Sequence, residues 1–357
     1  MKYKYLLFLL SWLSLPAYAD YTINPDDRLK VSIGGYARFF TGKVESHQYN
    51  NAMKTEPYVK VKFDINDDWS VGGKLAYRVI WDDRYSSSNR HKFYDAYATV
   101  ESKTFGKIDV GNLKNIGYLL HQGPTDVSIL CVEDSDIYLF YPSPKGFYSP
   151  ILTYMFTDAR DTKITYTTPD LNGFKWGITA VQSDDKKYDA IAPGVKIDHG
   201  KGVISSAQFI HDFDVLKVGV SAAYAYYHDD RFFYQNTEKD GHHSEISTGI
   251  NLSKNGYSWG AAYKQIVFED KLDIDDTYVY STGIAYEKDP YGVSLGYLYS
   301  KTKYIVKNNR HHAMLSGRYK FNQYMHGVLS TGYMEFDTDK GVDSNGFFGI
   351  ASMEFRL

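Results

Sequence analysis

Stretches in which apolar and polar residues alternate recur along almost the whole chain. In the first of them, Val31 and Ile33 alternate with Lys30 and Ser32. Alternation with a period of two is typical of a β-strand that has one apolar and one polar face. Patterns typical of amphipathic helices are scarce, and beyond the N-terminal region no run of about 18 apolar residues predicts a membrane-spanning helix. The chain is therefore expected to be all-β.

Sixteen segments show this alternation, and turn-forming residues separate them. Short connections, such as 66–69 and 254–256, alternate with longer polar connections, such as 184–200 and 228–242. The segments expected as strands are 27–42, 54–66, 70–82, 91–102, 105–113, 160–168, 173–183, 201–212, 215–227, 243–254, 256–268, 276–288, 290–303, 309–322, 324–336 and 345–357.

Connections that alternate between short and long are typical of a transmembrane β-barrel, whose strands need about 9–11 residues to cross the membrane. A closed barrel also leaves no unpaired backbone edge in the hydrocarbon. Many of the 34 tyrosines lie near the ends of expected strands, as Tyr224 and Tyr226 do, where an aromatic girdle would meet the membrane interface. We predict a 16-stranded antiparallel transmembrane β-barrel. The alternative is a secreted β-sandwich or solenoid, which would not need connections of alternating length.

The N-terminal residues have the pattern of an export signal. Lys2 and Lys4 precede a short apolar run, which is followed by an Ala-x-Ala sequence that ends at Ala19. This arrangement is typical of a secretory signal peptide, and the apolar run is too short for a membrane span. We expect residues 1–19 to be the signal peptide and residues 20–357 to form the barrel.

The last expected strand has a simple alternation in which Phe347, Phe355 and Leu357 share one apolar face. Chain termini usually fray unless another element holds them. An even number of strands brings both ends of the barrel to the side with the short turns. We therefore expect the last strand to close the barrel by pairing with the first.

One connection is much longer than the others. Residues 114–158 separate the fifth and sixth expected strands and include apolar side chains such as Leu130, Val132 and Phe140. An irregular connection of this length is normally functional. Its apolar content favours packing inside the barrel, as a long inserted third loop. The alternative is a lid outside the barrel.

Three motifs resemble those of a known family. FGKIDVGN, residues 105–112, resembles the strand that precedes the constriction loop in trimeric Gram-negative porins. DTKITYTTPDLNGF, residues 161–174, resembles a strand–turn–strand motif of the same porins. MEFRL, residues 353–357, resembles the assembly signal of outer-membrane barrels, with Phe355 in the alternating pattern and Leu357 in place of the usual terminal phenylalanine. The chain thus resembles the general bacterial diffusion porins.

This resemblance implies a water-filled channel in the bacterial outer membrane for the passive diffusion of small hydrophilic solutes and ions. It implies a homotrimer, in contact with outer-membrane lipid and lipopolysaccharide and inserted by the barrel-assembly machinery. It implies neither an enzymatic activity nor a cofactor. Residues 114–158 would fold back into the barrel as the constriction loop.

In such porins, acidic residues on the inserted loop face basic residues on the barrel wall. The acidic residues of the long connection are Asp126, Glu133, Asp134 and Asp136. Alternation places five basic residues on the inner face of the first three strands: Arg38, Lys60, Lys62, Lys74 and Arg78. Rings of charge at a constriction select and orient solutes. The alternative is the scatter of solvated charges that any water-filled barrel contains.

Other motifs are weaker. Two pairs of adjacent histidines, His242–His243 and His311–His312, lie in or beside expected outer connections, but no second pair of ligands follows at a defined spacing. The acidic run 273–276 lacks the glycine and the distal glutamate of a calcium-binding EF-hand loop. We expect no metal site. The formal net charge of −3 also argues against a nucleic-acid partner.

Two other functions compete with diffusion. An outer-membrane enzyme would need a Ser/His or Asp/His pair at a defined site, and the sequence suggests none. An adhesive or structural role through the outer connections, or a plugged and gated channel, is the second alternative.

Overall fold

The computed structural model describes residues 21–45, 48–82, 90–133, 135–141, 152–155, 161–182, 188–192, 195–234, 237–268, 275–303, 307–339, 341 and 344–356. These residues are mostly strand, with one short helix, α2 (Ile116–Leu119), and one 3-10 helix, η1 (Ser135–Leu139). No helix in the described ranges is long and apolar enough to cross a membrane. The predicted signal peptide and Leu357 lie outside the described residues.

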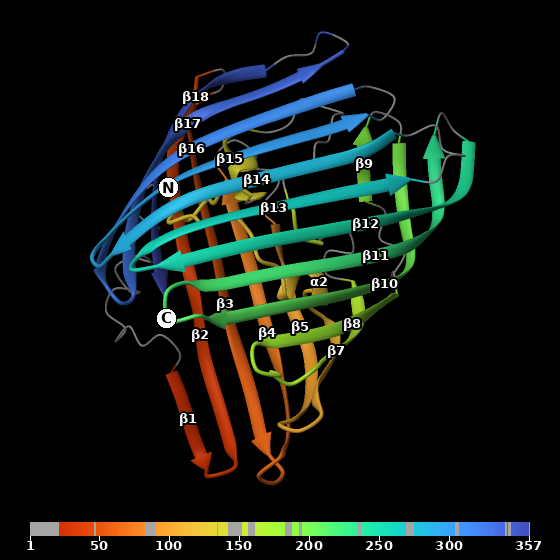
Figure 1. The fold of residues 1–357 in the computed structure, drawn as a ribbon, viewed down its shortest axis with the longest axis vertical. Helices are drawn as coiled ribbons and strands as arrows, with labels where there is room; N and C mark the ends of the chain where they lie inside the picture. Colours follow the sequence, from red (N-terminus) through yellow and green to blue (C-terminus); the bar gives the residue numbers. More distant parts are fainter. Residues whose placement is uncertain are drawn as a thin grey trace.

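Sixteen strands form a closed antiparallel barrel, which confirms the predicted fold (Figure 1). The ring closes where the last strand pairs with the first barrel strand, from Phe348 opposite Val44 to Arg356 opposite Tyr36. The expected pairing of the last segment with the first is therefore confirmed. The barrel strands are β2 (Leu29–Val44), β3 (Asn50–Asp64), β4 (Trp69–Asp82), β5 (Arg90–Ser102), β6 (Gly106–Asn112), β7 (Thr162–Thr167), β8 (Phe174–Gln182), β10 (Val195–Asp212), β11 (Lys217–Tyr234), β12 (Thr237–Lys254), β13 (Tyr257–Phe268), β14 (Asp275–Lys288), β15 (Tyr291–Lys303), β16 (Lys307–Asn322), β17 (Met325–Thr338) and β18 (Ser344–Arg356).

Two short strands were not predicted. β1 (Tyr21–Asp26) pairs with β2, and β9 (Tyr188–Ala192) pairs with β10, while β10 also pairs directly with β8. Neither strand is needed to close the ring. Both are short, so their alternation is too brief to stand out from the surrounding polar sequence.

The expected long connections 184–200 and 228–242 are largely strand instead, and this part of the prediction was wrong. β10, β11 and β12 continue well past the expected ends, and Phe232 still lies opposite Lys239. Backbone hydrogen bonds between neighbouring strands extend the ladder through these polar stretches. The alternation there is brief and broken by charged residues, as in Val195 and Ile197 beside Asp198, so the sequence did not separate it from a loop.

The outer face of the barrel is apolar and the inner face is polar, as the alternation predicts. Val59 and Leu75 are 41% and 49% exposed on the outer face, where lipid would cover them. Lys54 and Glu56, on the opposite face of β3, are buried within the protein. A short turn joins β12 to β13 through Asn255 and Gly256, whose φ angles of 51° and 85° suit an Asn-Gly hairpin.

The described part of the chain between β6 and β7 lies inside the barrel. In Figure 1 its yellow trace runs between the front strands and the rear strands β3–β5. We call its described residues 113–133, 135–141 and 152–155 the inserted segment. Its apolar side chains form a core with inward-facing side chains of the wall, in which Leu130 and Phe140 pack with residues such as Phe336. This packing fills one side of the barrel interior.

Candidate functional site

A cavity of about 660 Å³ lies between the inserted segment and the inner face of β2–β6. The strands supply most of the charged lining, and the segment supplies Tyr118, His121, Glu133 and Tyr154 among others. Six lining residues are basic: Arg38, Lys54, Lys74, Arg78, Lys107 and Lys114. Four are acidic: Glu56, Asp95, Asp109 and Glu133. Such a lining suits water and small polar solutes.

Hydrogen bonds attach the inserted segment to the opposite wall of the barrel. The amide of Gln122 donates to Ser221 Oγ on β11 at 2.9 Å. The hydroxyl of Thr125 donates to the carbonyl of Gly283 on β14 at 3.1 Å. The amide of Val127 donates to Ser294 Oγ on β15 at 3.1 Å. The segment therefore crosses β11 to β15 on their inner face, and the amides of Gln122 and Val127 find partners in wall hydroxyls.

Glycines make room for this crossing. We call Gly249, Gly260, Gly283 and Gly296, one on each strand from β12 to β15, the glycine row. Gly283 lies opposite both Gly260 and Gly296 in the strand register. A Cβ at Gly249 would lie 1.7 Å from the Gln122 carbonyl oxygen, and one at Gly260 would lie 2.3 Å from the Gly123 carbonyl oxygen. The glycine row thus forms a shallow track into which the backbone of the segment fits.

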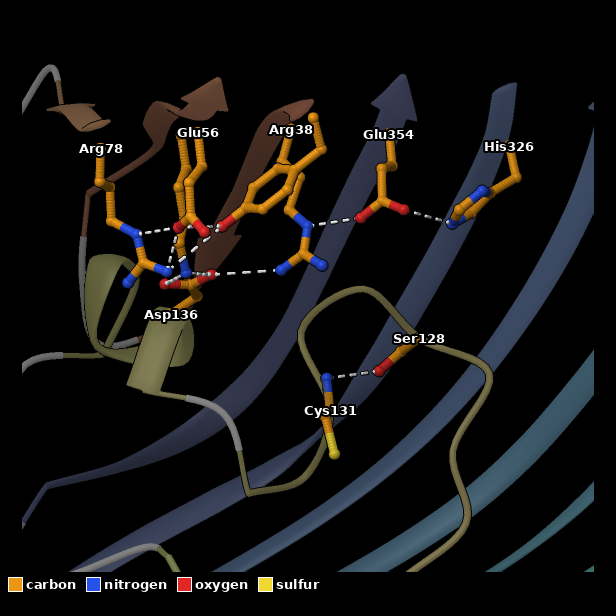
Figure 2. A network of polar contacts seen from close by, with 10 residues as sticks. Arg38, Glu56, Arg78, Ser128, Cys131, Asp136, His326 and Glu354 are labelled. Carbon is orange, nitrogen blue, oxygen red and sulfur yellow. Dashed lines mark hydrogen bonds and ion pairs between the residues drawn. The ribbon is translucent and has the colours of Figure 1, made fainter. Parts of the chain in front are cut away.

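On the other side of the cavity, ion pairs form a continuous network (Figure 2). Asp136 of the segment accepts two hydrogen bonds from Lys54 Nζ, at 2.8 and 2.6 Å. Its carboxylate also lies 3.9 Å from Arg38, whose Nε donates to Glu354 at 2.5 Å. This network joins the segment to β2, β3 and β18, so Asp136 fixes η1 of the segment against the charged wall.

The neighbouring cations of the wall are also paired. Arg78 donates to Glu56 at 2.7 Å and stacks on the ring of Tyr94, 3.0 Å from its centroid. Lys74 pairs with Asp95 at 2.9 Å. In each of these pairs the cation is more exposed than its acid.

The same difference in exposure holds for Lys107 and Asp109, whose Nζ and Oδ2 atoms are 2.7 Å apart. The lysine side chain is 35% exposed and the aspartate side chain 1%. In these three pairs the carboxylate is closer to the barrel wall, and the cation is the more accessible partner from the cavity. The surface that a solute meets is therefore more positive than the number of acids and bases suggests.

The structure separates the predicted basic residues into those that line the cavity and those that do not. Arg38, Lys74 and Arg78 line the cavity, whereas Lys60 and Lys62 are not among its lining residues. Lys62 instead pairs with Glu101 at 3.0 Å, lower on the wall. The prediction of one basic stripe was therefore too broad, because alternation gives the face of a residue but not its height in the barrel.

The acids of the long connection also separate. Asp136 meets the basic wall, but Asp126 accepts from Ser128 N, Val132 N and Ser294 Oγ on the opposite side. Asp126 thus organises the turn of the segment and holds it to β15, so the prediction that it faces the basic residues was wrong. Asp134 lies outside the described residues.

Several lining residues were not predicted. Lys54 and Glu56 share the inner face with Lys60, so the same alternation could have found them. Lys107 and Asp109 lie in the FGKIDVGN motif itself. The acids were overlooked because the expected pattern had only basic residues on the wall.

Glu133 is a lining residue of the cavity whose side chain is largely buried among polar groups. Its carboxylate accepts hydrogen bonds from the hydroxyl of Ser281 and, at 2.6 Å, from that of Thr153. Burial raises the pKa of Glu133 to about 7, against the opposing effect of these hydroxyls and of the Lys264 ammonium. Burial and the same ammonium lower the pKa of the nearby His121 to about 4, so His121 is neutral at pH 7.

The raised pKa of Glu133 predicts a loss of stability with rising pH. The folded protein favours the protonated carboxyl, so this stabilisation is complete below pH 4.5 and is lost as the pH rises through about 7. Between pH 4.5 and a pH above 7, the free energy of unfolding of the unaltered protein should therefore fall. We expect this fall to be roughly 3 kcal/mol larger than that of Glu133→Gln, whose side chain cannot ionise. Urea unfolding in detergent at a series of pH values measures the difference. Parallel curves for the two proteins would contradict it.

Comparisons with known proteins agree with this architecture. A family profile described as Gram-negative porin matches residues 7–341. The chain is similar to a loop-deletion mutant of OmpT, an outer membrane protein of Vibrio cholerae, with a TM-score of 0.66 and 15% identity over 93% of this chain and 100% of that one. It is also similar to Salmonella typhi OmpF, with a TM-score of 0.63 and 17% identity over 94% and 100% of the two chains.

The outer membrane channel DcaP of Acinetobacter baumannii gives a TM-score of 0.66 and 11% identity over 95% of this chain and 100% of that one. No curated protein sequence gives a significant match. At these identities the structural likenesses establish the fold, and the family profile establishes the family. Family and fold together support an outer-membrane diffusion channel, and they confirm the resemblance found in the sequence. The chain belongs to the Gram-negative porin family.

Proposed function

We propose that the protein is a passive pore for small hydrophilic solutes and ions, narrowed by the chain between β6 and β7. The observation that carries this proposal is the charge-lined cavity between the inserted segment and the wall of a closed barrel. In this proposal residues 1–19 are the cleaved signal peptide, and residues 114–158 are the constriction loop of a barrel formed by 20–357. Asp136 and Glu133 belong to the narrow zone, together with Arg38, Lys74 and Arg78.

The pore prefers anions in this proposal, because its cations are more exposed than the acids that pair with them. We expect a reversal potential of the sign for anion selectivity when a planar bilayer separates two KCl concentrations. The double variant Lys74→Gln/Lys107→Gln removes two of these cations and should shift the reversal potential toward cations.

Lys320→Gln is the control for this measurement. Lys320 pairs with Asp289 at a short turn and does not line the cavity, so the reversal potential should not change. Cation selectivity of the unaltered protein would overturn the anion preference. A folded and inserted barrel without current would overturn the open pore and favour a plugged channel.

A homotrimer is the second part of the proposal. The outer face of β18, β2, β3 and β4 has a hollow of about 430 Å³, lined by side chains that include Phe39, Met53, Trp81 and Met353. Polar groups also lie on this face, where Thr41 donates to Asn51 at 2.7 Å. A neighbouring protomer would cover both the hollow and these polar groups better than lipid does. A solved form of Vibrio cholerae OmpT is described as a trimer.

We expect chemical cross-linking in detergent to give a trimer, and Trp81→Ala to lower the temperature at which it dissociates. Trp259→Ala is the matched control, since Trp259 lies on the outer face of β13, on the other side of the barrel. A monomer by light scattering, or equal effects of the two variants, would contradict this interface. Lipopolysaccharide and the barrel-assembly machinery remain proposed partners, the latter through Phe355 and Leu357.

A further inference from the structure

Two histidines face each other across neighbouring strands on the outer surface of the barrel. His228 of β11 lies directly opposite His242 of β12. Their Nδ1 atoms are 2.9 Å apart. His228 shares its face with Tyr224 and Tyr226, which are 51% and 43% exposed. Neither histidine contributes to the lining of the cavity.

The pair lies at the end of the membrane-crossing part of the two strands. β11 starts at Lys217, directly after a short turn, and a strand needs about 9–11 residues to cross the hydrocarbon. His228 is reached at the end of that distance, next to Tyr224 and Tyr226, which we expect at the membrane interface. We therefore expect water and dissolved ions to reach the imidazoles.

The distance between the nitrogens suits two ligands of one metal ion. Transition metals bind imidazole nitrogen at about 2.0–2.1 Å, so two nitrogens at a right angle on the metal are about 2.9 Å apart. A right angle is the angle between neighbouring ligands in the tetragonal geometry of Cu²⁺ and Ni²⁺. The ring of Tyr226 stacks on His242, with 5.5 Å between the ring centroids, and holds its orientation.

We propose that His228 and His242 form a surface site for a divalent transition-metal ion, with Cu²⁺ as the preferred ion. The two Nδ1 atoms are the protein ligands, and water completes the coordination. Within the residues described, no group of three or more His, Cys, Asp or Glu side chains is arranged to hold a metal ion. An ion held by two imidazoles and water exchanges readily.

The register of the strands explains why adjacent histidines are not the ligands. His243 points inward and is 3% exposed, so it lies on the opposite face from His242. His311 and His312 are separated in the same way, and His311 Nδ1 lies 2.8 Å from the hydroxyl of Tyr297. Adjacent residues of one strand therefore cannot bind the same ion here, whereas the pairing of β11 with β12 places two outward-facing histidines opposite each other.

The competing explanation is a metal-free pair in which one neutral imidazole donates a hydrogen bond to the other. Titration of the untagged, folded protein with Cu²⁺ distinguishes the metal site from the metal-free pair. Isothermal calorimetry and electron paramagnetic resonance monitor the titration. We expect one ion per chain, with hyperfine splitting from two equivalent nitrogens. His228→Ala and His242→Ala should each lose this signal.

His311→Ala is the control, because it removes an outer-face imidazole that bonds to Tyr297 and should leave the signal intact. Urea unfolding provides a second readout, since an ion that binds only the folded state stabilises it. Cu²⁺ should stabilise the unaltered protein and His311→Ala more than it stabilises His228→Ala or His242→Ala. The proposal is overturned if no ion binds, if the two pair variants bind as the control does, or if the spectrum lacks the two nitrogens.

Discussion

Replacement of Asp136 by alanine is expected to destabilise the folded barrel by about 3–5 kcal/mol. The substitution removes the carboxylate that accepts two hydrogen bonds from Lys54 and leaves the buried ammonium of Lys54, which is only 5% exposed, without this counter-charge. The η1 part of the inserted segment also loses its link to Arg38 (Figure 2). Urea unfolding of the refolded protein in detergent measures the change in free energy.

Two further variants test the cause of this loss. Lys54→Met combined with Asp136→Leu removes both charges, so the double variant should recover most of the stability that Asp136→Ala loses. Glu101→Ala breaks a comparable but exposed pair with Lys62 and should cost less than about 1 kcal/mol. If Asp136→Ala costs no more than Glu101→Ala, the buried pair does not anchor the segment.

Alanine at the glycine row is expected to displace the inserted segment. A methyl group at Gly249 or Gly260 would collide with the backbone carbonyl of Gln122 or Gly123, and neither a rotamer change nor a flexible side chain can relieve the contact. We expect each variant to lose about 1–3 kcal/mol of stability, which is the usual cost of overpacking. The segment would move away from β12 and β13 toward β2–β6, so the single-channel conductance should fall.

Gly317→Ala is the matched control for the glycine row. It adds the same methyl group to a neighbouring strand, β16, at a position where nothing lies within 4 Å of the new Cβ. Stability and conductance should stay unchanged in this control. Unchanged conductance in Gly249→Ala and Gly260→Ala as well would show that the track does not position the segment.

The sequence predicted much of the barrel because its signals are local. The strand faces follow from alternation, as in Val59 against Lys60, and the short turns follow from residues such as Asn255 and Gly256. The ends of β10–β12 were not predicted, because their outer parts are held by backbone pairing and alternate too briefly, as Val195 and Ile197 do, to stand out from the charged residues around them.

The site was predicted only in part for a related reason. Alternation placed Arg38 and Arg78 on the inner face, but it carries no information on height in the barrel or on partners. Lys54 and Asp136 are 82 residues apart in the chain, and Arg38 and Glu354 are 316 apart. Their pairing exists only after the barrel has closed and the segment has folded into it.

By itself, then, the sequence determined the number of barrel strands, their faces and the closure of the last strand on the first. These features depend on the period of a strand and on the need to satisfy backbone hydrogen bonds in hydrocarbon. Only the tertiary structure decided which acid meets which base, how glycines on four strands align into one track and that His228 faces His242. Each of these requires register between strands, which arises from the pairing of the whole sheet and not from any one segment.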